Sequence, residues 1–378
     1  MTTQNHRYSF VCDYLDYIAS LVRKYQLFFY PEDNSIEMFD IKNKKIFLKR
    51  IVFPTIQLKD LFIGAEISIY SRKLKVVEYS DSFTRSVFEE INKSTYGMIK
   101  PDNYMNIGKI IDYISNTGLT ISKLKMVRMR KEDAYEFYKE HQGKSFYENL
   151  TDFMSSDYIV GMELVGRDAI LSWRSIIGPT NSEKAREEAP NSIRALFGTD
   201  GTKNAVHGSD SNDSANRELN FIFGKEGLKQ IPKLSNCSCL IIKPHIIQEG
   251  HAGKIIDIIL SQGFEISCME MFYLDKSTSE EFFEVYKGVL PEYSAIIDHV
   301  STGPIIAMEV RQDNVVNSLR ALVGPHDPEI AKLLRPNTIR AMFGQDRVKN
   351  AVHCTDLTDD GVLEVQYFFE LLQGNNVK

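Results

Sequence analysis

The sequence contains a long internal repeat. The segment RALFGTDGTKNAVHGSDS (Arg194–Ser211) recurs as RAMFGQDRVKNAVHCTDL (Arg340–Leu357), with eleven of eighteen positions identical. Shorter matching segments precede the two copies, among them MIKPD before the first and IIKPH before the second. Because a repeat of this extent marks two copies of one folding unit, we expect one module at 93–230 and another at 236–374. These are called module A and module B.

Within each module, short apolar runs alternate with stretches of helical period. In module A, Tyr96–Ile99 and Leu119–Met126 indicate strands, and 108–115, 131–140 and 168–177 have the spacing of amphipathic helices. Strands interleaved with helices at this spacing predict helices packed on a sheet, which places each module in the α+β class or the related α/β class.

Residues 1–92 belong to neither copy of the repeat. They contain short runs rich in Ile, Val, Phe and Tyr, and turn-forming residues break these runs at the spacing of β-hairpins. We therefore predict a small antiparallel β domain with at most one short helix. This segment contains no constellation of catalytic side chains.

Charge and cysteine usage narrow the possible functions. A net charge of −6 gives no chain-wide attraction to nucleic acid or to an anionic membrane, and no stretch reaches the length of an apolar membrane span. The five cysteines show no C-x-x-C spacing, which is typical of reduced thiols in the cytosol. We expect a soluble intracellular protein without a membrane or nucleic-acid partner.

The segment NAVHGSDS contains a candidate nucleophile, His207. Neither G-x-x-x-x-G-K-[ST] nor G-x-G-x-x-G occurs in the chain, so a phosphate site would need a different cradle. A neutral imidazole can attack a terminal phosphorus if an acceptor orients its other nitrogen. Glu218 could do this with Ser209 as a bridge, and Gly208 would leave space for a triphosphate. A histidine in an apolar loop is more often a buried core residue; the repeated constellation favours the nucleophile.

The pattern NxxHGSDS, with I-K-P-D upstream and a glutamate downstream, resembles the signature of the nucleoside diphosphate kinase family. The resemblance extends over nearly the full length of both modules. It implies a ferredoxin-like βαββαβ core and a ping-pong exchange in which ATP and nucleoside diphosphates are the partners. It also implies Mg²⁺ as the cofactor, bound to the nucleotide phosphates and not to protein side chains.

Carried over position by position, the resemblance implies the residue roles in module A. The catalytic positions are His207, Glu218, Ser209, Lys100 and Tyr138. The nucleotide-binding positions are Lys100, Phe146, Arg174, Thr180, Arg194 and Asn204. Phe146 would stack on the base, a contact that tolerates every base. The two arginines and the threonine would bind phosphate oxygens, and the asparagine would contact the ribose.

Module B keeps part of this set. The matching positions are Lys243, Arg320, Arg340, Asn350, His353, Thr355 and Glu364. The departures are Phe283 for the tyrosine, a base-stacking position near Pro291, His326 for the threonine and Cys354 for the glycine. Because the loss of one transition-state donor can cost ~10²–10³ in rate, we predict that module B is inactive. Regulatory nucleotide binding by module B stays open.

The order of a β domain, a complete module and a degenerate module resembles a ciliary branch of the same family. This resemblance implies a PH-like N-terminal domain of the doublet-microtubule type. It implies residence in the cytoplasm and cytoskeleton, inside the doublet microtubules of the ciliary axoneme. It also implies contact with tubulin, other axonemal proteins and γ-tubulin ring complexes, with the basal body or centrosome as further locations.

Two functions from different classes are therefore carried forward. One is an enzyme that exchanges phosphate at module A, and the other is a scaffold in which nucleotide binding is vestigial. Because two linked copies can form a dimer-type interface within one chain, we also expect a monomer with an internal pseudo-dimer. A nuclease activity finds no support, because the acidic chain lacks basic and aromatic stripes.

Overall fold

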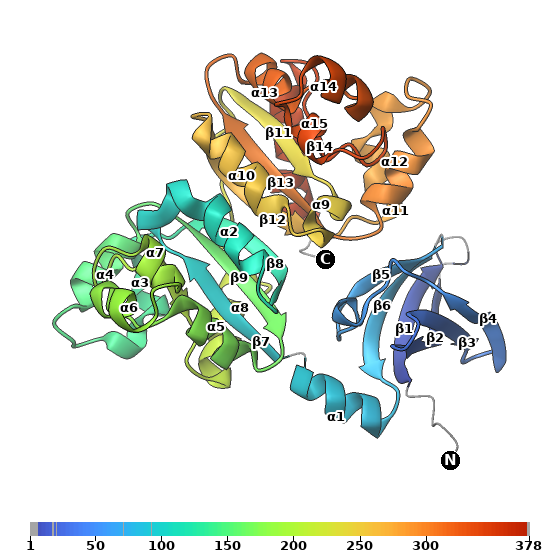
Figure 1. The fold of residues 1–378 in the computed structure, drawn as a ribbon, viewed down its shortest axis with the longest axis horizontal. Coiled ribbons are helices and arrows are strands. Elements are labelled where there is room, and N and C mark those ends of the chain that lie inside the picture. The colour runs from blue at the N-terminus through green and yellow to red at the C-terminus, as the bar shows by residue number, and fades with distance from the viewer. Residues whose placement is uncertain (1–6, 17–18, 20, 71, 92, 376–378) are drawn as a thin grey trace.

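The chain folds into three units, arranged side by side (Figure 1). The computed structural model describes residues 7–16, 19, 21–70, 72–91 and 93–375. The first unit is the N-terminal domain, and the other two are modules A and B. The outer limits of the predicted first domain, residues 1 and 92, lie outside the described residues.

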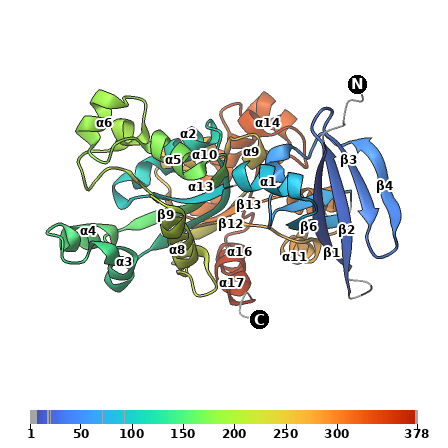
Figure 2. The same cartoon turned by 90° about the horizontal axis from the view of Figure 1, so that it is seen from below.

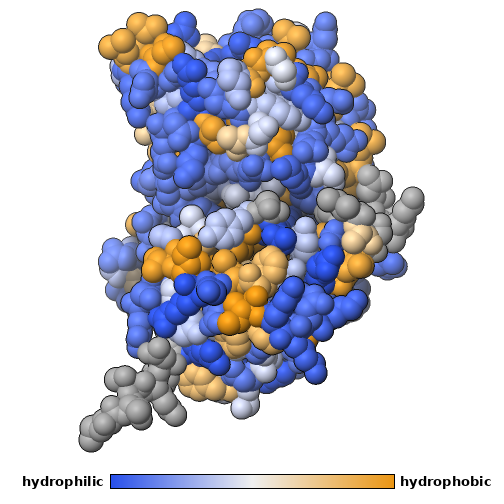
Figure 3. Space-filling model, turned by 90° about the vertical axis from the view of Figure 1, so that its right-hand side faces the viewer, coloured by the Kyte–Doolittle hydropathy of each residue, from blue (hydrophilic) through white to orange (hydrophobic). Residues whose placement is uncertain are grey.

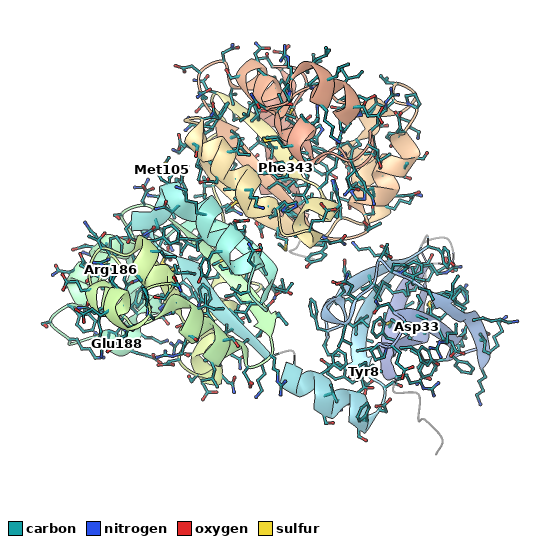
Figure 4. All side chains as sticks on the ribbon, in the orientation of Figure 1. Tyr8, Asp33, Met105, Arg186, Glu188 and Phe343 are labelled. Carbon is teal, nitrogen blue, oxygen red and sulfur yellow. The ribbon has the colours of Figure 1, made fainter. Side chains whose placement is uncertain are left out.

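The N-terminal domain is a six-stranded antiparallel sheet in the order β4-β3-β2-β1-β6-β5. Its elements are β1 (Tyr8–Asp16), β2 (Leu21–Tyr30), β3 (Ser35–Asp40), β4 (Lys45–Val52), β5 (Glu66–Ile69), β6 (Arg72–Tyr79) and α1 (Ser82–Ile91). Helix α1 packs against β1, where the ring of Phe88 lies edge-on to Tyr8 and Phe10 at centroid distances of 4.9 and 5.0 Å. Tyr8 therefore lies beside α1 (Figure 4). The predicted β domain with one short helix is confirmed.

Module A has the ferredoxin-like arrangement. Its elements are β7 (Lys93–Ile99), α2 (Ile107–Ser115), β8 (Thr120–Arg128), α3 (Lys131–Phe137), α4 (Tyr147–Met154), β9 (Tyr158–Gly166), α5 (Ala169–Ile177), α6 (Ser182–Glu188), α7 (Ile193–Phe197), β10 (Val206–Gly208) and α8 (Asn212–Phe223). The strand order is β10-β7-β9-β8, so the first and last strands of the module are neighbours. This order brings the end of the chain segment back beside its beginning, which positions His207 next to Met98.

Module B repeats this plan. Its elements are β11 (Cys237–Ile242), α9 (Pro244–Gln248), α10 (Ala252–Ser261), β12 (Glu265–Phe272), α11 (Lys276–Phe282), α12 (Tyr293–Val300), β13 (Ile305–Arg311), α13 (Val315–Val323), α14 (Pro328–Leu334), α15 (Ile339–Phe343), β14 (Val352–Cys354), α16 (Asp360–Gln366), a π-helical turn (Tyr367–Leu371) and α17 (Leu372–Asn375). The predicted fold class is confirmed in both modules.

The two modules share one eight-stranded sheet. Its order is β10-β7-β9-β8-β12-β13-β11-β14, so β8 and β12 join the modules edge to edge. Lys125 and Glu270 pair across this junction, and their side chains form a partly buried ion pair at 3.2 Å. Helices cover both faces, with α2, α5, α10 and α13 on one side and α8 and α16 on the other (Figure 2). The sheet therefore has an approximate two-fold arrangement within one chain.

Helices α2 and α10 cross at two reciprocal glycines. A Cβ placed on Gly108 would lie 2.3 Å from the backbone nitrogen of Asp257, and one on Gly253 would lie 2.2 Å from that of Asp112. Because the backbones touch, no side chain fits at either position without displacing a helix. Apolar side chains of both helices then join one core that runs through both modules, among them Ile110, Ile114, Ile255 and Ile259.

The remaining connections also hold the units together. At the end of module A, the side chain of Gln230 accepts from the backbone nitrogen of Met269 in module B at 2.8 Å. The N-terminal domain contacts module B through Lys73, whose ammonium donates to the carbonyl of Leu274 at 2.7 Å, and through Ser68. The three units therefore form one body. In the part of the chain that is described, no helix is both long and apolar enough to cross a bilayer.

Candidate active site

His207 lies on β10, at the edge of the sheet, with one ring nitrogen held. Its Nε2 lies 3.0 Å from Oε2 of Glu218, and the hydroxyl of Ser209 donates to the same oxygen at 2.6 Å. Because a carboxylate only accepts, Nε2 carries the proton, and the lone pair is on Nδ1. The carboxyl of Glu218 is buried, whereas 21% of the His207 side chain is exposed. The arrangement therefore gives His207 a nucleophilic Nδ1.

The local sequence explains why Glu218 is in place. Ser211 is the N-cap of α8, and its hydroxyl accepts from the backbone nitrogen of Ser214 at 3.2 Å. The hydroxyl of Ser214 in turn donates to Asp210 at 2.8 Å. These contacts fix the start of α8 directly after β10. Glu218 then follows on the helix face that is turned toward the sheet.

Aromatic rings surround the imidazole of His207. The ring centroids of Tyr96, Phe137 and Tyr138 lie 6.1, 5.6 and 6.0 Å from its own. Burial raises the pKa of the Tyr138 hydroxyl, and the negative charge of Glu218 adds to this. The Tyr138 hydroxyl oxygen has no hydrogen-bond partner among the described residues. It is a buried donor beside the nucleophile that a ligand oxygen could satisfy.

Positive charge lines the same cavity. The ammonium of Lys100 donates to Oδ1 of Asn204 at 2.7 Å and to the carbonyl of Thr202 at 3.1 Å. Burial, with the nearby charge of Arg194 as the second cause, lowers the pKa of Lys100 to about 8. Burial also lowers the pKa of Arg194 to about 10, with Arg174 as the second cause. An anion bound in the cavity would stabilise the charged forms of Lys100 and Arg194.

Nine of the ten predicted residues line one cavity of about 550 Å³, and the tenth, Ser209, is buried behind Glu218. The volume lies in the range that small-molecule sites occupy. Phe146 is half exposed in its wall, and the side chain of Arg174 has no hydrogen bond or ion pair in the described part of the chain. Chain segments more than 100 residues apart thus meet here, although the role of each residue stays a prediction.

Two residues near this cavity were not predicted from the sequence. His141 stacks on Tyr138 and lies edge-on to Phe146 at 5.6 Å, and it lines the cavity. Arg217 forms an ion pair with Glu140, which ties α8 to the turn after α3. Arg217 could have been identified from the sequence, because it directly precedes Glu218 in α8. Nothing in the sequence pairs His141 with the cavity, since that depends on how the turn folds.

Gly208 lies in the cavity wall, and the structure gives a second reason for a glycine at this position. A Cβ on Gly208 would lie 2.6 Å from the indole of Trp173, so the missing side chain makes room for that ring. The indole nitrogen also donates to the carbonyl of His207 at 3.2 Å. In module B the corresponding pair is Leu319 and Cys354, both buried in the same core. Cys354 therefore packs against a smaller partner than Gly208 does, and it also lies in the wall of the module B cavity.

Module B keeps the nucleophile and its support. Nε2 of His353 lies 3.1 Å from Glu364, and the hydroxyl of Thr355 donates to the same oxygen at 2.9 Å. The side chain of His353 is only 8% exposed, against 21% for His207. A cavity of about 480 Å³ lies beside it and includes Lys243, Arg320, Arg340, Asn350 and His353 in its wall.

This second cavity keeps two polar contacts of module A and lacks a third. Asn350 donates to the carbonyl of His326 at 3.1 Å, as Asn204 donates to that of Thr180. Its own Oδ1 has no partner in the described part of the chain, whereas Oδ1 of Asn204 accepts from Lys100. Lys243 donates to the carbonyl of Val348 at 2.8 Å. Burial lowers the pKa of Lys243 to about 7 and that of His326 to about 4. Pro291 is not in the cavity wall, which contains Leu290 and Tyr293 instead.

Comparisons with known proteins agree with this architecture. The family model "Nucleoside diphosphate kinase" matches residues 93–228 and 236–373, and the model "Nucleoside diphosphate kinase 7 N-terminal PH domain" matches 2–90. Nucleoside diphosphate kinase homolog 7 from Rattus norvegicus is 45% identical over 372 residues, covering 98% of this chain and 94% of the relative. The Mus musculus protein gives the same values. The nucleoside diphosphate kinase of Aquifex aeolicus is 51% identical over 128 residues, 33% of this chain and 90% of its own. The chain belongs to the nucleoside diphosphate kinase family.

Proposed function

We propose that module A is a nucleoside diphosphate kinase that transfers phosphate through His207. The observation that carries this proposal is the contact between Nε2 of His207 and Glu218, which leaves the lone pair on Nδ1 in a cavity lined by cations. Nδ1 attacks the γ-phosphorus of a nucleoside triphosphate, the bond to the β-phosphate oxygen breaks, and a nucleoside diphosphate leaves. A second nucleoside diphosphate then attacks the phosphohistidine through its β-phosphate oxygen and breaks the P–N bond.

The surrounding residues would stabilise the charges of both steps. Lys100, Arg174 and Arg194 supply positive charge where the equatorial oxygens become more negative. Glu218 accepts the hydrogen bond of Nε2 and so stabilises the ring as it gains positive charge. Mg²⁺ accompanies the nucleotide, where it would neutralise part of the charge on the phosphate oxygens.

A labelling experiment with full-length protein tests this proposal. Incubation with γ-labelled ATP should give a phosphate on the protein that is labile in acid and stable in base. His207→Ala should remove it, and the matched variant His353→Ala in module B should keep it. Equal labelling of wild type and His207→Ala would show that the phosphate is elsewhere, and the proposal would be wrong.

A second candidate is a structural role in the ciliary axoneme, with tubulin or other axonemal proteins as partners. The supporting observation is the edge strand β4, whose far side has no neighbouring strand in the described sheet. Ile46, Ile51 and Val52 are 54%, 41% and 55% exposed there, and apolar side chains gather on this side of the molecule (Figure 3). Exposed strand edges with apolar residues favour pairing with another protein.

The structural role predicts a separation of two properties. A chain lacking residues 1–90 should lose its incorporation into axonemes and keep its exchange activity in solution. The matched full-length variant His207→Ala should lose exchange and still be incorporated. Unchanged incorporation of the truncated chain would remove the N-terminal domain from any role in placement.

A further inference from the structure

One end of the module B cavity contains an internal ion pair. Arg320, near the end of α13, donates from Nη1 to the carboxylate of Asp356 at 2.6 Å and to its backbone carbonyl at 2.5 Å. The hydroxyl of Tyr286 donates to the other carboxylate oxygen at 2.7 Å. All three residues are in the cavity wall. The carboxylate of Asp356 is therefore already paired with the guanidinium of Arg320, to which an incoming anion would bind.

The corresponding residues of module A are not paired in this way. The repeat aligns Asp356 with Asp210 and Arg320 with Arg174. The carboxylate of Asp210 accepts from the hydroxyl of Ser214 at 2.8 Å, which is the main cause of its lowered pKa. The guanidinium of Arg174 has no such partner in the described part of the chain, and it is exposed in the cavity wall.

Sequence differences after His353 explain why Asp356 is paired differently from Asp210. Module B has Leu357 where module A has the capping Ser211, and Asp360 where module A has Ser214. Leucine cannot cap a helix, and α16 begins only at Asp360. Asp360 has no hydroxyl to donate to Asp356. Asp356 has therefore lost the serine contact that holds its counterpart in module A.

In module B a tyrosine hydroxyl donates to Asp356 in place of the serine hydroxyl that donates to Asp210 in module A. In the turn after α11, Tyr286 stands where module A has His141, three residues beyond the aromatic position of Phe283. Its hydroxyl reaches across the cavity to Asp356, and burial raises its pKa, so that it stays a donor. Arg320 from α13, Tyr286 from this turn and Asp356 from the loop after β14 thus join three separate segments (Figure 1).

We propose that Asp356 acts as an internal anion at the phosphate-binding end of module B and determines which module accepts nucleoside di- and triphosphates. This inference rests on the proposed function for the location of the phosphate-binding end. The side chains of Arg320 and Asp356 are 45% and 47% exposed, so their mutual attraction is modest. The exclusion comes mainly from repulsion, because a phosphate that reaches Arg320 meets the carboxylate beside it.

Binding of MgADP to the full chain tests this assignment. Equilibrium dialysis counts all bound nucleotide, and the single tryptophan, Trp173, reports module A alone because it lies beside His207. We expect wild type to bind one ADP per chain with a change in tryptophan fluorescence. Asp356→Asn should add a second site by raising the affinity of module B at least about tenfold, with the tryptophan response unchanged.

Two further variants make the result specific. The double variant Leu357→Ser/Asp360→Ser restores the serine pair of module A and should add the second site while Asp356 itself stays in place. Asp298→Asn removes the same charge from an exposed ion pair with Lys276, away from the cavity, and should add nothing. A second site in wild type, its absence in both the Asp356 and the serine variants, or its appearance in the Asp298 variant would each overturn the inference.

A different result would contradict the proposed function of module A. If wild type shows no tryptophan response and binds no ADP, module A does not accept the nucleotide. The gain in the Asp356 variant is still counted by dialysis, so it is judged separately. A gain without any module A site would place nucleotide binding in module B once its internal anion is removed.

Discussion

Trp173 and Gly208 share one space. The indole lies 2.6 Å from the point where a Cβ on Gly208 would stand, and its nitrogen donates to the carbonyl of His207. The glycine after the histidine therefore allows a large ring to hold the strand that carries the nucleophile. Module B holds the same strand with Leu319 against Cys354. A large and a very small side chain fill this part of the core in module A, and two side chains of intermediate size fill it in module B.

This relationship predicts a compensating pair of substitutions. Gly208→Ala should lower the free energy of unfolding by about 1–3 kcal/mol, because the new methyl group overpacks the core. The double variant Trp173→Leu/Gly208→Cys copies module B and should recover part of that loss. Urea unfolding of Trp173→Leu, Gly208→Cys and the double variant measures the coupling between the two positions. Additive effects would show that the two positions do not share space.

Glu218 is predicted to support His207 in the chemical step. Glu218→Gln should lower the exchange rate by about 10²-fold while ADP binding changes little, because an amide stabilises the charged ring less than a carboxylate. Single-turnover phosphorylation by ATP measures the step. The matched variant Glu364→Gln in module B should leave the rate unchanged. A loss of similar size in both variants would place the reaction in both modules.

Lys100 is predicted to make nucleotide binding depend on pH. Its pKa in the folded chain is about 8, so its charge is lost as the pH rises through that value. The affinity for MgADP should therefore fall between about pH 8 and 10, followed by the fluorescence of Trp173. Lys100→Met should bind more weakly and show no such fall. A wild-type affinity that is constant over this range would contradict the assignment.

The same pKa has a consequence for stability. The pKa of Lys100 is lower in the folded state than its ordinary value of 10.5, so burying the charge destabilises the fold at neutral pH. Below pH 8 both states hold the proton, and the penalty is fully present. As the pH rises from about 8 to 10.5 only the unfolded state keeps the proton, so the contribution of Lys100 to stability should increase. Urea unfolding of wild type and Lys100→Met across this range compares the two slopes.

The helix crossing between the modules predicts a position-specific effect of alanine. Gly108→Ala should destabilise the chain by about 1–3 kcal/mol, because its methyl group would meet the backbone of α10. Gly118→Ala is the matched control, since nothing lies within 4 Å of its added carbon. Thermal unfolding measures both. Equal effects would mean that the crossing is looser than the contact between Gly108 and Asp257 indicates.

Much of the site follows from local spacing. Glu218 lies eleven residues after His207, and a strand followed by a capped helix returns it to the ring, as the serines of NAVHGSDS allow. The repeat likewise predicts two modules, because identical segments fold alike. Hairpin spacing was enough to predict the N-terminal sheet. These are short-range relations, in which the order of residues limits the geometry strongly.

Other relations are long-range, and only packing decides them. Lys100 and Asn204 are 104 residues apart, and their 2.7 Å contact depends on β7 and β10 becoming neighbours. The space beside Gly208 belongs to an indole from another element, which the motif alone does not reveal.

The sequence by itself determined the two modules, their fold class and the candidate nucleophiles His207 and His353. The tertiary structure decided which charges face each other. Among the described residues Arg174 has no ion-pair partner, whereas Arg320 is paired with Asp356, although both arginines occupy the same place in the repeat. The physical reason is that a side chain's partner depends on every segment that packs around it, and module B lacks the serine that holds Asp210 in module A.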